Sequence, residues 1–138
     1  MKAAYVLKFN VGYVSQNMTC VQIQRDTGMW YSVEYSSFSV GPEADKYRLS
    51  VSGFSGDESD ALAATVRSGT IANGMKFSSP DRDNDNHPSG PCSGGISGWW
   101  FNMCSRSVLN SDANGCWNAV TDAYIRDVVF SRMLVKLD

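Results

Sequence analysis

The sequence NGMKFSSPDRDNDNHPSGPCSGGISGWWFNMC, residues Asn73 to Cys104, is the stretch around which the rest of the chain is organised. Its three acidic side chains, Asp81, Asp83 and Asp85, stand at alternate positions before a loop rich in proline and glycine. Carboxylates at this spacing repel one another. Calcium, which accepts about six to eight oxygen ligands in flexible geometry, relieves that repulsion. The stretch therefore predicts a calcium-supported loop that presents a binding surface.

An EF-hand does not explain this loop, although its spacing of acidic residues matches the start of one. An EF-hand loop needs glycine at its sixth position and a bidentate glutamate at its twelfth. Counted from Asp81, these positions hold Asn86 and Cys92. The other interpretation from the residues alone is a solvated acidic turn that binds nothing specific.

The composition is that of one globular domain over residues 1–138. Hydrophobic residues make up 43% of the chain and charged residues 19%, which are ordinary values for a folded domain. The net charge of −2 supplies no basic surface for nucleic acid, and no apolar run approaches the roughly 20 residues that span a bilayer. With His87 as the only histidine, the chain lacks the residues for a nucleophile–histidine pair or a two-histidine zinc site. We do not expect an enzyme.

The N-terminal segment MKAAYVLKFNVGYV does not fit a signal peptide. Lys8 interrupts the part that should be apolar, and no small-residue cleavage site follows. Residues 4–14 have a weak strand pattern instead. We therefore expect that a leader has been removed or that the chain begins within a longer domain.

Alternating apolar and polar residues predict an antiparallel sheet. Residues 20–24 place Val21 and Ile23 on one face, and residues 30–40 form the second strand of a hairpin whose turn is residues 26–28. Further strands are predicted at 47–51, followed by a loop over 52–60, and at 127–137. The last is expected to be a central strand with inward-facing Phe130, Met133 and Val135.

Residues 57–67 predict a short helix. Ser59 or Asp60 would cap it, and its apolar stripe would be Leu62, Ala63 and Val66. The expected class is α+β, a twisted and mostly antiparallel sheet with one short helix. Residues of about 20–75 and 125–138 would form the sheet region, and residues of about 76–124 a long, loop-rich calcium- and ligand-binding region.

Three segments carry a family resemblance. They are EYSSFSVGPEADKYRLSVSGFSGDESDAL (34–62), NGMKFSSPDRDND (73–85) and CSGGISGWWFNMCSRSVLN (92–110). In this order they resemble the fibrinogen-related domain, and the resemblance extends from Cys20 to Asp138. The N-terminal subdomain of that family has no counterpart in the chain. The resemblance thus implies an N-terminally truncated domain, whose absent region could have supplied homo-oligomerisation.

The resemblance implies the residues of the calcium site. Asp83 and Asp85 would bind through their side chains, and His87 and Ser89 through their carbonyl oxygens. Because one extra residue precedes Cys92, the carbonyl of Gly90 could replace that of Ser89.

The resemblance also implies a disulfide between Cys92 and Cys104 beside this loop. It further implies a cis peptide bond between Met103 and Cys104 that orients a ligand pocket. Such a bond costs about 3–4 kcal/mol and persists only where its surroundings enforce it.

By the same resemblance, the pocket would take the acetyl groups of N-acetylated sugars, and it would consist of Ile96, Phe101, Met103, Cys104 and Ser105. Trp99 and Trp100 are expected in the core. The chain departs from sugar-binding members in three ways. Ser105 stands where histidine is frequent, Ile96 stands where an aromatic residue is common, and the segment from Leu109 to Gly115 is shortened.

The expected function is therefore that of a secreted, calcium-supported recognition module. It would bind acetylated glycans or microbial surfaces in a lectin-like manner, as in innate immunity. The alternatives are an extracellular protein-binding or matrix-type domain without sugar binding, and a degenerate fragment. Asn17-Met18-Thr19 is a possible glycosylation acceptor, which fits a secreted glycoprotein.

Cys20 and Cys116 have no counterparts in the resemblance. They could form a second bridge, remain two buried thiols, or pair between chains. The sequence favours buried thiols.

Overall fold

The computed structural model describes residues 14–135 except 17, 96, 112–113 and 120–125. The described part of the chain contains strands and short 3₁₀ turns. In chain order these are β1 (Val14–Gln16), β2 (Thr19–Arg25), β3 (Trp30–Val40), η1 (Glu43–Asp45), β4 (Leu49–Gly56), η2 (Ser68–Thr70), β5 (Ser107–Val108), β6 (Cys116–Trp117) and β7 (Val128–Val135). None of its helices has the length and apolarity needed to cross a membrane.

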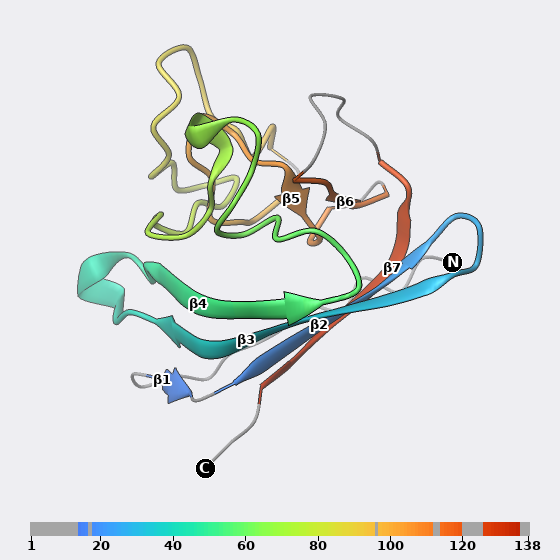
Figure 1. The fold of residues 1–138 in the computed structure, drawn as a ribbon. Helices are drawn as coiled ribbons and strands as arrows, with labels where there is room; N and C mark the ends of the chain where they lie inside the picture. Colours follow the sequence, from blue (N-terminus) through green and yellow to red (C-terminus); the bar gives the residue numbers. More distant parts are fainter. Residues whose placement is uncertain (1–13, 17, 96, 112–113, 120–125, 136–138) are drawn as a thin grey trace.

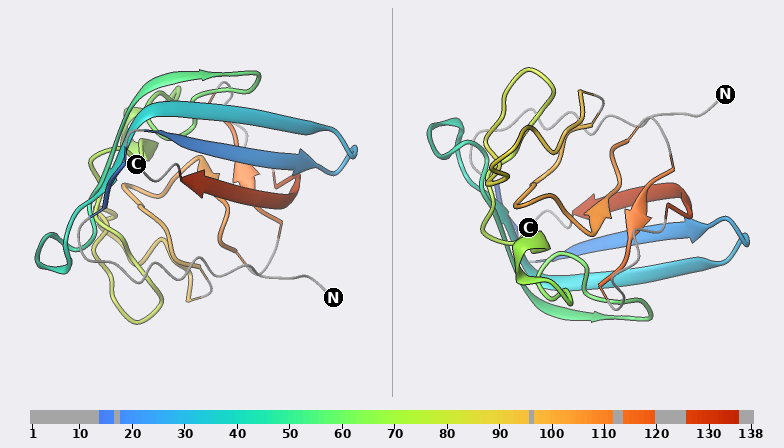
Figure 2. Two further views of the ribbon diagram at one scale, coloured as in Figure 1. Left: turned by 90° about the horizontal axis from the view of Figure 1, so that it is seen from below. Right: turned by 90° about the horizontal axis from the view of Figure 1, so that it is seen from above.

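A five-stranded antiparallel sheet forms the base of the molecule (Figure 1). Its order is β1-β3-β2-β7, and β4 also pairs with β3. The segment between β4 and β7 is mostly loop and contains a second, two-stranded sheet of β5 and β6. This segment lies over one face of the large sheet, and Figure 2 shows the same arrangement from two further directions.

The β2–β3 hairpin follows the predicted alternation. Val21 pairs with Val33 and is 1% exposed, and Ile23 on the same face is 2% exposed. Gly28 closes the turn with φ +85°, a left-handed conformation that glycine adopts without steric cost. The predicted strands at 20–24 and 30–40 are confirmed. The weak strand predicted at 4–14 lies outside the described residues, apart from Val14 at the start of β1.

The predicted loop at 52–60 is wrong over its first half, because β4 continues to Gly56. Phe54 pairs with Tyr35 and Ser55 with Glu34, so β3 supplies hydrogen-bonding partners beyond Val51. The sequence does not alternate between apolar and polar residues here, because all the residues from Ser52 to Gly56 are exposed. Strand pairing, rather than burial, determines this part of β4.

The helix predicted at 57–67 is also wrong, since this segment makes only one turn. Asp60 accepts hydrogen bonds from the amides of Ala63 and Ala64, but the next amides and carbonyls bond elsewhere. The Leu62 carbonyl accepts from the amides of residues 72 and 73, and the Val66 amide donates to the Ala119 carbonyl. These long-range hydrogen bonds replace the i to i−4 ladder that a helix needs. Val66 is left 54% exposed.

The prediction of β7 as a central strand is wrong within the described residues. There β2 is the one named strand that pairs with β7, which lies at an edge, and a single bridge joins Val128 to Gly115. Met133 and Val135 pack against the core as predicted, but Phe130 is 38% exposed. A register shift at residues 24/25 inserts one extra residue between Val128, which is buried, and Phe130. Such a bulge turns the following side chains to the other face.

The core joins the sheet to the loop-rich segment. Trp99 and Trp100 are 3% and 5% exposed, which confirms that both are core residues. Trp117 is completely buried and donates its indole N–H to the Ser59 carbonyl at 2.7 Å. The loops are thus attached to the sheet by large aromatic side chains.

Candidate functional site

The predicted calcium loop is wrapped around the carboxylate of Asp85. One oxygen of Asp85 accepts the His87 amide and the other accepts the Cys92 amide, both at 2.8 Å. Asp83 is exposed and accepts the Asp85 amide at 3.1 Å. Backbone amides therefore hold each of the two predicted ligand carboxylates against the loop.

Asn84 and Asn86, which sequence reasoning missed, attach this loop to the protein. The Asn84 side chain donates to the Phe77 carbonyl at 2.8 Å, and its amide donates to the Ser78 hydroxyl at 2.9 Å. Asn86 bonds to Asn102 through both backbone and side chain. The Asp-Asn alternation in the sequence could have revealed this role, because alternate residues of an extended segment face opposite sides.

Asp81 belongs to a separate feature. Its carboxylate accepts the Ser79 hydroxyl at 2.7 Å, and this hydrogen bond lowers the pKa of Asp81 below its usual value. One of its carboxylate oxygens is therefore engaged within its own turn.

The disulfide between Cys92 and Cys104 is confirmed, with a Cα–Cα distance of 5.1 Å. The predicted cis bond between Met103 and Cys104 is wrong, since the described residues contain no cis peptide bond. The tight turn here is made by the left-handed backbone of Cys104 (φ +65°), and the Asn102 amide donates to the Cys104 carbonyl at 3.0 Å. Cys20 and Cys116 are not bonded to each other. Cys20 is partly exposed on β2, and Cys116 is 1% exposed on β6.

The donor set of the loop fits a hard cation. No group of three or more His, Cys, Asp or Glu side chains suited to a metal occurs among the described residues, so a site would need carbonyl oxygens as well as the two carboxylates. His87 and Ser89 are exposed, and no backbone amide in the described ranges donates to either carbonyl. Carboxylates combined with free carbonyls suit calcium.

The predicted ligand-binding residues lie in different environments. Met103 is 52% exposed, whereas Phe101 and Ser105 are each 2% exposed. Cys104 is half-buried in the disulfide, and Ile96 lies outside the described residues. Of the four described residues, Met103 therefore presents the largest side-chain surface to a ligand.

Gly69 in η2 was not predicted, but it supports Met103. Its carbonyl accepts the Met103 amide at 2.8 Å, and a Cβ on Gly69 would lie 2.5 Å from the Met103 methyl carbon. The sequence gives no signal for this contact, because the two residues are far apart in the chain.

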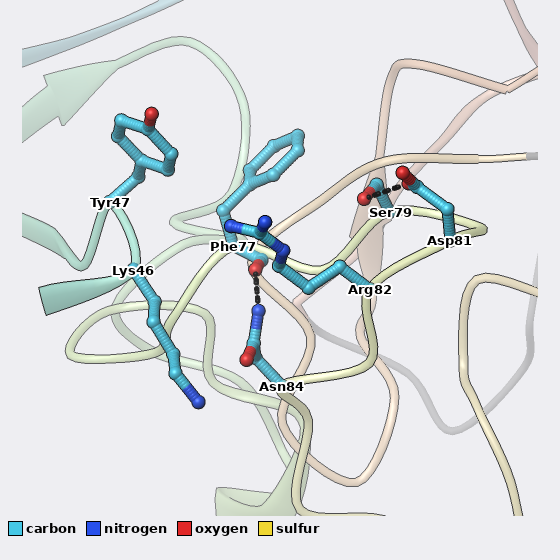
Figure 3. Close-up of a pocket in the computed structure, with 7 residues that line it drawn as sticks. All are labelled: Lys46, Tyr47, Phe77, Ser79, Asp81, Arg82 and Asn84. Atoms are coloured by element: carbon cyan, nitrogen blue, oxygen red, sulfur yellow. Dashed lines mark hydrogen bonds between the residues drawn. The ribbon is translucent and has the colours of Figure 1, made fainter. Parts of the chain in front are cut away.

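A pocket of ≈ 240 Å³ lies beside the acidic loop (Figure 3). It takes side chains from the turn after η1 and from the segment that leads into the loop. The lining residues are Lys46, Tyr47, Phe77, Ser79, Asp81, Arg82 and Asn84.

Three curated proteins are similar to parts of this chain. The human fibrinogen gamma chain is 38% identical over 98 residues, covering 65% of this chain and 22% of its own length. Mouse fibrinogen-like protein 1 is 38% identical over 94 residues, covering 64% of this chain and 30% of its own length. Bovine angiopoietin-4 is 40% identical over 91 residues, covering 65% of this chain and 17% of its own length. The matches thus span less than a third of each relative.

Solved structures show the same fold. The fibrinogen-like globe domain of human ANGPTL6 matches with a TM-score of 0.70 and 28% identity, over 88% of this chain and 56% of that one. A lamprey fibrin D-dimer in complex with the peptide Gly-His-Arg-Pro-amide matches with a TM-score of 0.74 and 26% identity, over 86% and 44%. This chain therefore spans about half of each solved chain.

The family model of the C-terminal globular domain of fibrinogen beta and gamma chains matches residues 10–126. We conclude that the chain belongs to this family, whose members are non-enzymatic binding domains.

Proposed function

We propose that this chain is an extracellular recognition module whose ligand-binding surface is supported by calcium. The observation that carries the proposal is that backbone amides of one loop hold the carboxylates of both Asp83 and Asp85. The exposed residues His87 and Ser89 follow, and no backbone amide in the described ranges donates to their carbonyls. Calcium would be bound by the carboxylates of Asp83 and Asp85 and the carbonyls of His87 and Ser89. A bound calcium would neutralise the two carboxylates and stiffen the loop beside the disulfide.

An extracellular location is supported by the Cys92–Cys104 disulfide. Structural disulfides persist in oxidising compartments and are rare in the cytosol. Within the proposed module, residues 1–138 act as one domain in which the large sheet carries the loop-rich binding region.

The proposed ligand site lies next to the disulfide. Met103 would contact the ligand through its side chain and Cys104 through its backbone, with Phe101 and Ser105 supporting them from the core and Ile96 completing the site. The first candidate ligand is an acetylated glycan, whose methyl group suits a small apolar contact and whose carbonyl suits a backbone N–H. The exposed thioether of Met103 supports this candidate.

The second candidate is a peptide or protein ligand. The observation that favours it is the similarity to the lamprey fibrin D-dimer, which is in complex with the peptide Gly-His-Arg-Pro-amide. The buried positions of Phe101 and Ser105 also favour it, because they leave little aromatic or hydroxyl surface for a sugar ring.

Calcium binding is tested by the melting temperature with and without calcium. A ligand at about 100 times its Kd stabilises the native state by about 2.7 kcal/mol, so calcium should raise the melting temperature and a chelator should lower it. Asp83→Asn should abolish this shift. Asp81→Asn is the matched control and should keep it, since Asp81 belongs to the separate turn of residues 79–82 and is not one of the proposed ligands. Equal calcium shifts in the two variants, or none in the wild type, would contradict the proposed site.

The ligand is tested on a column of immobilised N-acetylglucosamine. Retention in calcium, with elution by free N-acetylglucosamine or by chelator, supports the acetylated glycan. Flow-through by a protein that still binds calcium contradicts it. In that case binding of Gly-His-Arg-Pro-amide, measured by calorimetry, would support the peptide ligand.

A further inference from the structure

The pocket beside the acidic loop is built from two rigid turns. The first contains Lys46 and Tyr47, which both have left-handed backbones, with φ of 54° and 56°. Residues other than glycine adopt this conformation rarely, at a cost of about 1–3 kcal/mol, and strained backbones of this kind cluster at binding sites. Hydrogen bonds to both of their carbonyls help to hold the strained pair. The Phe77 amide donates to the Lys46 carbonyl at 2.9 Å, and the Trp100 indole donates to the Tyr47 carbonyl at 2.7 Å.

The second turn runs from Ser79 to Arg82. The amide of each of these two residues donates to the carbonyl of the other, at 3.0 and 3.1 Å. Pro80 occupies the second position of the turn, where its fixed φ favours the β-turn conformation. Because both turns are fixed through their backbones, the positions from which the lining side chains project are set before any ligand binds.

The charges in the pocket are separated. Figure 3 shows Arg82 reaching across the pocket toward Phe77, and Asp81 lying with Ser79 on the other side. Lys46 supplies a second cation on the side away from Asp81. Among the described residues, Arg82 has one ion-pair contact, with Glu43 at 3.9 Å, and both side chains are more than half exposed. Such exposed pairs contribute little, so an incoming anion can displace Glu43.

We propose that this pocket binds one acidic sugar unit, apart from the ligand site next to the disulfide. The guanidinium of Arg82 would pair with the anionic group in a planar, two-point contact, with Lys46 as a second charge. The exposed ring of Tyr47 would pack against the face of the sugar. Asp81 keeps one carboxylate oxygen that can accept a sugar hydroxyl, while its other oxygen accepts Ser79.

Pocket size and chemistry favour a sugar over an acidic peptide. A volume of ≈ 240 Å³ is below the roughly 300–1,000 Å³ of sites for drug-sized ligands and suits a single ring. A carboxylate opposite two cations requires a ligand that is anionic at one end and donates hydroxyls at the other. Uronic acids carry a carboxylate and sulfated sugars a sulfate, and both have this arrangement.

The test is an NMR titration of the folded chain with the methyl glycosides of glucuronic acid, of galactose 6-sulfate and of galactose. We expect saturable shifts at Lys46, Tyr47 and Arg82 with one or both acidic sugars, and not with neutral galactose. The response of the two acidic sugars identifies whether carboxylate or sulfate is preferred. Binding should weaken as salt rises. Equal binding of galactose, or binding of an aspartate-containing peptide alone, would overturn the proposal.

Two variants assign the binding to the pocket. Arg82→Gln should weaken acidic-sugar binding by at least about tenfold, because a charged hydrogen-bonding partner is lost. Lys76→Gln is the matched control, since it removes one positive charge next to Phe77 but does not line the pocket. Its effect should stay within about twofold. Equal effects of the two substitutions would show that only general electrostatic attraction is at work and would overturn the proposal.

The titration is run in calcium and again in chelator. Acidic-sugar binding should persist in chelator, because no pocket contact requires the metal. A protein without a calcium shift that still binds glucuronide at Arg82 contradicts the proposed function and leaves this site standing. A calcium-binding protein with no acidic-sugar response contradicts only this site.

Discussion

Tyr35 shows how one buried polar group links the sheet to the loops. Its ring is completely buried in β3, and its hydroxyl donates to the Asp60 carboxylate at 2.6 Å. The same carboxylate oxygen accepts the Ala63 amide at 3.0 Å. The phenol thus stabilises the single turn that replaces the expected helix.

Tyr35→Phe should destabilise the protein in a pH-dependent way. At neutral pH the lost hydrogen bond should lower the free energy of unfolding by about 1–2 kcal/mol. Burial, reinforced by Asp60, raises the pKa of Tyr35 well above its ordinary value of about 10. The folded state therefore keeps the proton to higher pH than the unfolded state, and this contribution to stability is lost as pH rises above about 10.

The measurement is urea unfolding of wild type and Tyr35→Phe between pH 7 and 11. The difference in stability should narrow above about pH 10, because only the wild type releases this proton on unfolding. A difference that stays constant or widens across this range would contradict the assigned role.

Gly56, at the end of β4, meets backbone where a side chain would be. A Cβ at this position would lie 2.5 Å from the Ser32 carbonyl oxygen and 2.7 Å from the Val33 Cα, and φ is +150°. Gly28 also has a positive φ, of +85°, but nothing lies within 4 Å of its Cβ position. Alanine substitutions at Gly56 and Gly28 therefore separate the cost of backbone strain from the cost of a steric clash.

Gly56→Ala should lower the free energy of unfolding by about 3 kcal/mol or more, since strain and overpacking both act. Gly28→Ala should cost about 1 kcal/mol, from strain alone. The stabilities are compared through the midpoints of denaturant unfolding curves, provided that the dependence of the unfolding free energy on denaturant concentration is unchanged. Equal losses in the two variants would mean that β3 and β4 move apart without cost.

At the scale of the element, the loop of residues 81–104 depends on side-chain acceptors and one covalent bond rather than on regular structure. Asp85 accepts the amide of Cys92, so the carboxylate and the disulfide hold the same point of the backbone. Asn86 and Asn102 connect the two sides of the loop. Loosening the disulfide should therefore also loosen the proposed calcium site.

Replacement of both Cys92 and Cys104 by serine should lower the free energy of unfolding by about 3 kcal/mol, given the 12-residue separation. Calcium affinity, measured by calorimetry, should fall with it. Cys20→Ser is the matched control, because Cys20 is partly exposed on β2 and lies outside this loop. Calcium affinity equal to that of the wild type in the double variant would show that the proposed calcium site does not depend on the disulfide.

At the scale of the whole molecule, Arg25 joins the sheet to the loop-rich segment. Its guanidinium forms ion pairs with Glu58 and Asp127 and donates to the Trp117 carbonyl at 3.0 Å. These partners come from the start of the loops, from β6 and from the residue before β7. The three charged side chains are only 14–25% exposed.

Arg25→Met should lower the free energy of unfolding by about 2–4 kcal/mol, because two partly buried carboxylates lose their partner. Adding Glu58→Gln should recover part of the loss, since one unpaired charge is then removed.

Arg132→Met is the control, because Arg132 is exposed and bonds to Gln22. It should cost less than about 1 kcal/mol. Thermal denaturation of the wild type and the three variants measures these changes in stability. Equal losses in Arg25→Met and Arg132→Met would contradict a joining role for Arg25.

The sequence by itself determined the features that depend on neighbouring residues or on a recognisable motif. The β2–β3 hairpin follows from alternation and a turn glycine, and the family follows from the segments at 34–62, 73–85 and 92–110. The disulfide followed from the same resemblance, and the core positions of Trp99 and Trp100 followed from the general burial of large apolar side chains. Local signals of this kind survive folding because nothing distant competes with them.

Only the tertiary structure decided the features that depend on distant partners. The turn at Asp60 is not a helix because the amides of residues 72 and 73 and the carbonyl of Ala119 take up its hydrogen bonds. Phe130 faces outward because a bulge in its pairing with β2 shifts the register. The pocket at Lys46 and Arg82 likewise joins two turns far apart in the chain. In each case the deciding free energy comes from contacts between distant segments, which no local pattern encodes.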